Sequence, residues 1–160
     1  MSVEQAANQP VETHAPARLT LRAVSLILIA LGILVTGYLS IAELTNTTTA
    51  CIESGAFNCD VVQNSVYSKI MGIPIAVLGF GTYVVLGALV ALENRLSFLQ
   101  AYGVALVFAI TLFGFLYSAW LTYIEFFQLK ALCPWCLASA AIMTLLFIVS
   151  GLRLRQTLLD

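Results

Sequence analysis

Four long apolar stretches limit the folds open to this chain. Each is long enough to cross a hydrocarbon core about 30 Å thick, which takes roughly 20 helical residues. Backbone groups inside a bilayer must be hydrogen-bonded within the segment, so each stretch is predicted to be a helix. A mean hydropathy of +0.97 and a charged fraction of 9% exclude an ordinary soluble domain. The sequence therefore predicts an all-α membrane protein, a four-transmembrane-helix bundle, with spans over approximately residues 23–42, 70–92, 98–123 and 133–152.

The basic residues fall unevenly on the two sides of these spans. Five lie before the first span, between the second and third spans, or after the fourth span: Arg18, Arg22, Arg95, Arg153 and Arg155. Only two lie in the other two connections: Lys69 and Lys130. Cytoplasmic segments carry the excess of Lys and Arg, so both termini are expected in the cytoplasm. We expect residues 1–19 to form a disordered cytoplasmic tail, 20–155 the four-helix domain and 156–160 a second cytoplasmic tail. The loops 43–69 and 124–132 then face outward.

The first outer loop contains the pattern of a short helix. Asp60 is predicted as its N-cap, with Gln63 reaching back in a capping box. Val62, Val66 and Ile70 recur at helical spacing, with polar residues between them. The sequence predicts an amphipathic helix lying on the membrane surface, and an incidental interfacial turn is the alternative.

Four cysteines, all in or beside the outer loops, carry the chemistry of the sequence. Cys133 and Cys136 form a C-x-x-C with Pro134 between them, at a position that Pro favours as the first residue of a helix. Cys133 is then the N-cap, where free backbone N–H groups and the helix dipole stabilise a thiolate. Cys136 lies nearly one turn further into the membrane. This geometry predicts an outer thiol that exchanges and an inner thiol that meets a lipophilic substrate.

Cys51 and Cys59 lie close together in a polar loop. A disulfide between them would close a short loop and stabilise the fold by less than the roughly 3 kcal/mol expected for a 15-residue loop. It would act either as a structural staple or as an exchangeable pair that meets both a soluble partner and the C-x-x-C. A four-cysteine zinc site and capture of a soft metal are further alternatives. His14 is in the predicted tail, which excludes a Cys–His nucleophile pair.

Two segments resemble the vitamin K epoxide reductase family. They are CDVVQNSVYSKIMGIP, which begins at Cys59, and CPWCLAS, which begins at Cys133. The resemblance covers most of residues 20–152 and includes the order of the two cysteine pairs and the topology. Bacterial oxidases of the DsbB type carry the C-x-x-C in the first outer loop instead, so the order here favours the epoxide reductase family.

The resemblance implies an electron relay. A thioredoxin-fold, DsbA-like partner would attack Cys51, Cys59 would pass the exchange to Cys133, and Cys136 would act on a membrane quinone of the ubiquinone or menaquinone (vitamin K) type. Ser65 and neighbouring Asn64 would lie near the quinone ring. Other pocket candidates, which as plain sequence also suit packing or interfacial roles, are Leu78, Tyr117, Thr122, Trp135 and Ser139. No metal site is expected.

Two departures from the family refine this expectation. Many bacterial relatives carry a fused thioredoxin-like domain, whereas this chain stops at Asp160, so a separate partner is expected to supply electrons. Animal relatives have a tyrosine shortly after the C-x-x-C, but Leu137-Ala138-Ser139-Ala140 follows here. We therefore expect quinone reduction coupled to disulfide formation, in a bacterial inner (plasma) membrane with the cysteines on the extracytoplasmic side.

Two alternatives remain open on the sequence. One is an enzyme that reduces vitamin K epoxide itself, and the other is a non-catalytic metal-binding or disulfide-stapled membrane protein. The source of the protons for a quinone is unexplained. Asp60 and Glu125 lie at a plausible depth, but surface carboxylates are usually solvated, so both are left outside the predicted site.

Overall fold

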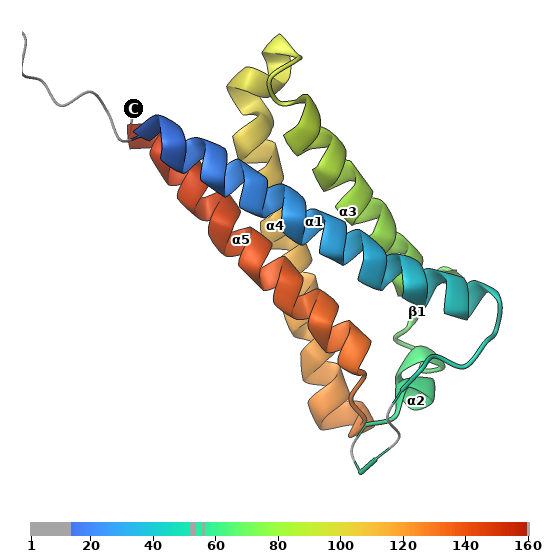
Figure 1. Ribbon diagram of the computed structural model, residues 1–160. Helices are drawn as coiled ribbons and strands as arrows, with labels where there is room; N and C mark the ends of the chain where they lie inside the picture. Colours follow the sequence, from blue (N-terminus) through green and yellow to red (C-terminus); the bar gives the residue numbers. More distant parts are fainter. Residues whose placement is uncertain (1–13, 52–53, 56, 160) are drawn as a thin grey trace, which may run out of the picture.

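The computed structural model describes residues 14–51, 54–55 and 57–159, and its main feature is four long helices (Figure 1). They are α1 (His14–Leu44), α3 (Ile75–Leu92), α4 (Ser97–Ile124) and α5 (Pro134–Leu159). All four are long and apolar enough to cross a membrane, with candidate spans Leu19–Leu44, Ile75–Leu92, Ser97–Leu129 and Pro134–Leu159. The predicted all-α, four-helix membrane fold is confirmed.

The helices form a bundle in which each packs against two neighbours. α1 packs mainly against α3 and α5, and α4 packs against α5 and, less extensively, α3. The start of α1 and the end of α5 lie at the same end of the bundle (Figure 1). All four helices contribute to the buried core, which comprises Ile29, Tyr83, Leu86, Val90, Val107, Met143 and Leu146.

One close approach fixes the seam between α1 and α3. A Cβ at Gly32 would overlap the ring of Tyr83, a side chain that is only 1% exposed. Tyr83 crosses the bundle from there, and its hydroxyl donates a hydrogen bond of 2.9 Å to the carbonyl oxygen of Ser139 on α5. A glycine on α1 therefore lets one aromatic side chain join three helices, in keeping with the use of small residues at membrane helix interfaces.

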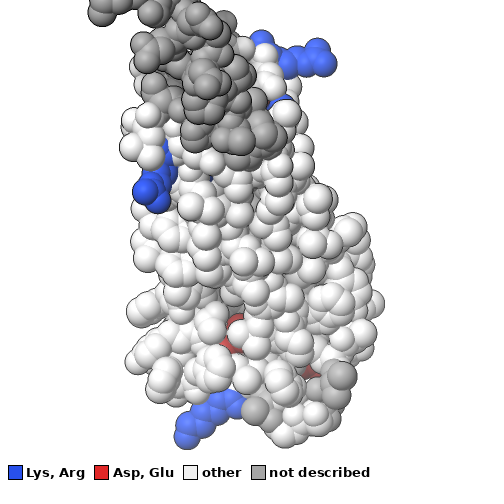
Figure 2. All heavy atoms as spheres, turned by 60° about the vertical axis from the view of Figure 1, so that its left-hand side comes forward, with Lys and Arg blue, Asp and Glu red and all other residues white. Residues whose placement is uncertain are grey.

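Polar contacts tie the helices together at the end remote from the cysteines. Arg153 on α5 forms an ion pair with Glu93, which follows α3. The Arg22 side chain of α1 donates to the carbonyl oxygens of Val90 and Ala91. On the face shown in Figure 2, Lys and Arg lie toward the two ends, and the surface between them is mostly uncharged, with small areas of Asp or Glu in its lower half. That distribution suits a protein whose middle faces lipid.

The outer connection between α1 and α3 contains the short helix α2 (Cys59–Gln63), and its start differs from the prediction. Asn58 is the N-cap: it has extended backbone angles, and its side chain accepts a hydrogen bond from the Val61 N–H. Asp60 lies inside the helix. Gln63 does not reach back but donates to the Thr49 hydroxyl at 3.2 Å. Asn58 is favoured because an N-cap must itself be non-helical.

A β-hairpin, not a continued helix, leads from α2 into α3. Strands β1 (Lys69–Ile70) and β2 (Ile73–Pro74) pair antiparallel around a two-residue turn. Met71 and Gly72 both have positive φ, as a type I′ hairpin turn requires. The prediction of one amphipathic helix through residue 70 is therefore wrong beyond Gln63, and the second span begins at Ile75.

The helical ends also reach into the predicted tails. α1 begins at His14, inside the segment 1–19 that was expected to be a disordered tail, and α5 continues to Leu159, through most of 156–160. Residues 1–13 and 160 lie outside the described residues.

Candidate active site

Backbone pairing between the two outer loops brings their cysteines together. Phe57 forms a parallel bridge with Leu132, and the Asn58 N–H donates to the Leu132 carbonyl oxygen at 3.1 Å. The next residue in each segment is a cysteine, Cys59 after Asn58 and Cys133 after Leu132. The pairing therefore fixes the register that sets these two side chains face to face.

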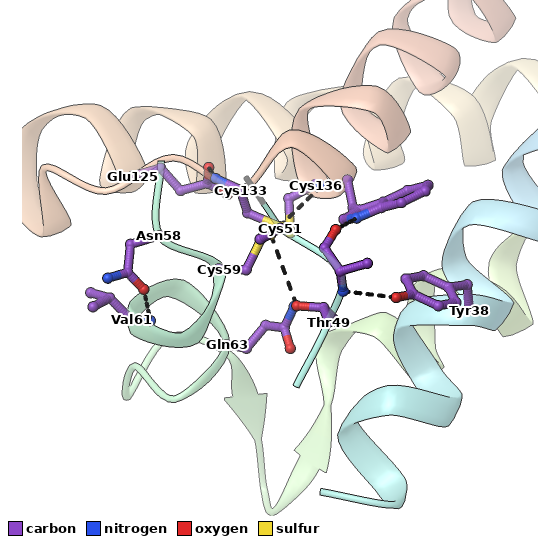
Figure 3. Close-up of a disulfide and its surroundings, with 12 residues drawn as sticks. Tyr38, Thr49, Cys51, Asn58, Cys59, Val61, Gln63, Glu125, Cys133 and Cys136 are labelled. Atoms are coloured by element: carbon purple, nitrogen blue, oxygen red, sulfur yellow. Dashed lines mark hydrogen bonds between the residues drawn. A yellow bond between two sulfur atoms is a disulfide. The ribbon is translucent and has the colours of Figure 1, made fainter. Parts of the chain in front are cut away.

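The four sulfur atoms form a continuous series (Figure 3). Cys51 and Cys59 are joined by a disulfide, and Cys133 and Cys136 are free thiols. The Sγ of Cys133 lies 3.6 Å from the Sγ of Cys59. Cys59 and Cys133 are almost completely buried, at 1% and 0% exposure. The Cys51–Cys59 disulfide thus contacts the Cys133 thiol inside the protein, away from solvent.

The start of α5 places Cys133 as the sequence predicted. Pro134 is the first helical residue, and the Cys133 carbonyl oxygen accepts the first helical bond from the Leu137 N–H at 2.9 Å. The Cys136 N–H donates to Cys133 Sγ at 3.3 Å. The hydrogen bond from the Cys136 thiol is the largest cause that lowers the pKa of Cys133, and the backbone N–H groups of Cys136 and Trp135 add to it. Desolvation and the charge of Glu125 oppose it. Cys133 is therefore held toward the thiolate, the form that attacks disulfides.

Two aromatic side chains hold the segment before Cys51. The Ala50 N–H donates to the Tyr38 hydroxyl oxygen at 2.9 Å, and the Trp135 indole N–H donates to the Ala50 carbonyl oxygen at 3.0 Å. The two rings contact each other with centroids 5.0 Å apart. Both backbone groups of Ala50 are thus bound by side chains from α1 and α5, which fixes the chain directly next to the outer disulfide.

Glu125 belongs to this site, contrary to the prediction that it is a solvated surface carboxylate. It begins the π-helix η2 (Glu125–Leu129), which extends α4 and ends where Lys130 adopts a left-handed backbone conformation. Glu125 is only 5% exposed, and its Oε2 accepts a hydrogen bond of 3.2 Å from the Cys133 N–H. π-helical turns often occur at functional sites. An acidic residue at the end of an apolar span was the signal available in the sequence.

A cavity of about 280 Å³ lies between the four long helices, next to Cys136. Cys136 lines it, whereas Cys51, Cys59 and Cys133 do not. Five of the predicted quinone-pocket residues also line it: Ser65, Leu78, Tyr117, Thr122 and Ser139. Its walls are mainly apolar with a few polar groups, which is typical of sites for small organic ligands.

Two predicted pocket residues are outside the cavity lining. Asn64 ends α2, and its side chain donates to the Asp60 carbonyl oxygen at 3.0 Å. Trp135 points to Ala50, as described above. Asn64 and Trp135 are adjacent in sequence to Ser65 and Cys136, which do line the cavity. The sequence does not show which way each side chain points. The cavity therefore does not support these two assignments, which stay predictions.

Several polar lining residues were missed by the sequence analysis. They include Glu43, Gln63, Tyr67, Tyr83 and Glu125. Ser65, which was expected near the quinone ring, donates its hydroxyl hydrogen to the Val62 carbonyl oxygen at 2.8 Å. The Tyr117 hydroxyl has no hydrogen-bond partner among the described residues. Within those residues, no group of three or more His, Cys, Asp or Glu side chains is arranged to hold a metal ion.

Comparison with known proteins gives one family. The model of the vitamin K epoxide reductase family matches residues 23–151, which include all four long helices over most of their length and all four cysteines. No curated protein matches the chain.

Proposed function

Because this chain belongs to the vitamin K epoxide reductase family, and is therefore a membrane oxidoreductase, we propose that it couples disulfide formation to quinone reduction. In this proposal a thioredoxin-fold, DsbA-like partner outside the cytoplasm gives two electrons to the enzyme. The enzyme passes them through its two cysteine pairs to a membrane quinone. The partner leaves with a disulfide, and the quinone leaves as a quinol.

The 3.6 Å approach of Cys59 and Cys133 carries this proposal. Thiol–disulfide exchange needs a thiolate next to a disulfide sulfur, because it proceeds through a mixed disulfide. The pair lies in a buried cluster of Cys59, Val62, Ala131 and Cys133, so a mixed disulfide between the two loops needs little rearrangement. A disulfide that only stapled the outer loop would have no need of a free thiol buried against it.

The exchange steps balance without a further reactant. The partner reduces the Cys51–Cys59 disulfide and becomes oxidised. Cys59 then attacks Cys133 of an oxidised Cys133–Cys136 pair, which releases the Cys136 thiolate. Cys51 attacks Cys59, re-forms the outer disulfide and releases Cys133. The reduced inner pair gives two electrons to the quinone and closes its disulfide again. The structure corresponds to the stage with the outer pair oxidised and the inner pair reduced.

The energetics favour a quinone as the acceptor. A DsbA-like partner has a reduction potential near roughly −120 mV, and about 30 mV corresponds to roughly 1.4 kcal/mol for two electrons. Re-oxidising the reduced partner requires an acceptor with a higher reduction potential. The reduction potential of the glutathione pool is lower than that of the partner. A quinone dissolved in the bilayer would reach a cavity between membrane helices directly, which accounts for an enzyme embedded in the membrane.

The cavity offers groups for a quinone at the inner thiol. Cys136 and the predicted residues Ser65, Leu78, Tyr117, Thr122 and Ser139 share its lining. A reduced quinone develops negative charge on its oxygens, and donors placed there would stabilise that charge. The unpartnered hydroxyl of Tyr117 is the first candidate donor. The hydroxyl hydrogen of Ser65 is engaged by Val62, so Ser65 would have to rotate to donate.

The placement of the charges supports an outward-facing site. Arg22, Arg95, Arg153 and Arg155 belong to the end of the bundle opposite the cysteines, while Lys69 and Lys130 belong to the cysteine end. By the positive-inside rule, this distribution supports an extracytoplasmic position of the cysteines, where disulfides persist and a DsbA-like partner would meet them.

Quinone reduction by purified protein in detergent tests this function. The donor is a reduced DsbA-like protein, and a soluble ubiquinone or menaquinone analogue is the acceptor. We expect turnover by the wild type and none by Cys136→Ala. If a folded wild-type protein transfers no electrons from any such donor to either quinone class, the proposed function is wrong.

A further inference from the structure

Two carboxyl groups line the cavity beside Cys136. Glu43 comes from the last turn of α1, and Glu125 begins η2 at the end of α4. Reduction of a quinone to a quinol takes two protons as well as two electrons. The geometry around Cys133 favours its thiolate, and the pKa of Cys133 is lowered accordingly. The inner dithiol therefore brings one proton, from Cys136, and the cavity must supply the other.

Glu125 has the surroundings of a group held as a neutral acid. It is 5% exposed, and the one hydrogen bond that it receives comes from the Cys133 backbone N–H. The only ion pair among the described residues joins Arg153 and Glu93 at the opposite end of the bundle. Burying a carboxylate without a nearby cation costs free energy, so the protonated, neutral form of such a group is favoured. Ionisable residues inside membrane spans mark proton and substrate pathways.

Glu43 connects the cavity with the outer side. Its Oε2 is buried and has no hydrogen-bond partner among the described residues. Glu43 lines the same cavity as Cys136. Its carboxyl group interacts electrostatically with Lys69, which lies on the exposed strand β1. Glu43 thus combines a buried, unpartnered carboxyl oxygen with a charged, solvent-exposed neighbour on the outer side.

We propose, on the basis of the function above, that Glu125 and Glu43 deliver the two protons to the quinone. Glu125 gives its proton to one quinone oxygen and takes the thiol proton of Cys136. Glu43 gives its proton to the other oxygen and regains one from the outer side past Lys69. The Cys133–Cys136 bond forms, two electrons pass to the quinone and two O–H bonds form. The Cys133 thiolate and the Glu43 acid are consumed, and a disulfide, a Glu43 carboxylate and a neutral quinol result.

Glutamine separates this role from a structural one. In Glu125→Gln the amide oxygen still accepts the Cys133 N–H, but the side chain cannot release a proton. In Glu43→Gln no hydrogen bond within the described residues is lost, because Glu43 Oε2 makes none. Asp60→Asn is the matched control, since Asp60 is an acid of the outer segment that does not line the cavity. Other titratable groups face the cavity or its carboxyls, and their side chains are unchanged in these variants: Tyr67, Lys69, Tyr83, Tyr117, Cys133 and Cys136.

The test measures two half-reactions as functions of pH. Pre-reduced enzyme is mixed with a soluble quinone analogue in a single turnover, and oxidised enzyme is mixed separately with the reduced DsbA-like donor. We expect each glutamine variant to reduce quinone about 100-fold more slowly, the usual scale for a lost general acid, and to react with the donor within twofold of the wild-type rate. Asp60→Asn matches the wild type in both, and Glu125→Asp recovers part of the quinone rate.

The outcomes separate the two proposals. Wild-type rates of quinone reduction in both glutamine variants would overturn the proton route while leaving the enzyme function intact. Equal slowing of both half-reactions, with a lowered unfolding temperature, would also overturn it, since that pattern indicates lost positioning. A wild-type enzyme that exchanges with the donor but never reduces quinone would instead overturn the proposed function.

Discussion

Replacing Gly32 by alanine tests the packing that shapes the cavity wall. The new Cβ would lie 2.6 Å from Tyr83 Cζ and closer still to two other ring carbons, where carbon atoms normally pack at about 3.5–4.0 Å. Tyr83 is fully buried, and its ring cannot move away without disturbing its hydrogen bond to the Ser139 carbonyl oxygen. We therefore expect a loss of stability.

The magnitude follows from three contributions. Overpacking a well-packed core costs about 1–3 kcal/mol, and loss of the Tyr83 hydrogen bond costs about 0.5–1.5 kcal/mol. Alanine in place of glycine within a helix returns about 0.5–1 kcal/mol. The net destabilisation is about 0.5–4 kcal/mol, which at about 2–4 °C per kcal/mol lowers the unfolding temperature by roughly 1–16 °C.

Gly81→Ala provides the matched control. Gly81 lies on α3, and no heavy atom lies within 4 Å of the position that a Cβ would occupy there. Thermal unfolding in one detergent, followed by circular dichroism, should give an unchanged or slightly raised midpoint for Gly81→Ala and a lowered one for Gly32→Ala. Equal midpoints for the two variants would refute the packing argument, because only the clash with Tyr83 distinguishes them.

Three further predictions concern the cysteines. Cys51→Ala should abolish quinone reduction with the protein donor but retain it with dithiothreitol, which can reduce the inner pair directly; loss with both donors would contradict the assigned order. The double variant Cys51→Ala/Cys136→Ala should form a Cys59–Cys133 disulfide on mild oxidation, detected by peptide mass spectrometry, because the two sulfurs lie 3.6 Å apart. Cys59→Ala/Cys136→Ala is its control, and equal cross-linking of Cys51 to Cys133 would argue against the register of the loops. Because the pKa of Cys133 is lowered, its thiolate should form on raising the pH before that of a free cysteine, and exchange should accelerate only up to that pH. The midpoint of this titration is measured from the thiolate absorbance, with the outer pair oxidised. Cys136→Ala removes the hydrogen bond that contributes most to lowering the pKa of Cys133, so it should move the midpoint to higher pH. An unmoved midpoint would exclude the Cys136 hydrogen bond as the cause of the lowered pKa.

Local features of the fold were predictable because they depend on neighbouring residues. Hydropathy and length identified four spans, and Pro134 marked the start of α5 with Cys133 as its cap. Competing local signals were harder to rank. Asp60 and Asn58 are both good N-caps, and only Asn58 has the extended backbone that a cap needs. Gly72 suited a hairpin turn, but Met71 before it is not a usual turn residue, and the helical spacing of Val66 and Ile70 favoured a helix.

The sequence by itself determined the class of the protein and the chemistry available to it: four membrane helices, two cysteine pairs on one side, and a helix start that favours a thiolate. The tertiary structure decided which groups meet. Cys59 contacts Cys133 across 74 residues because two loop backbones pair, and Glu125 enters the site because a π-helical turn follows α4. These outcomes depend on the order and register in which helices and loops pack, and residues adjacent in sequence carry no record of that packing.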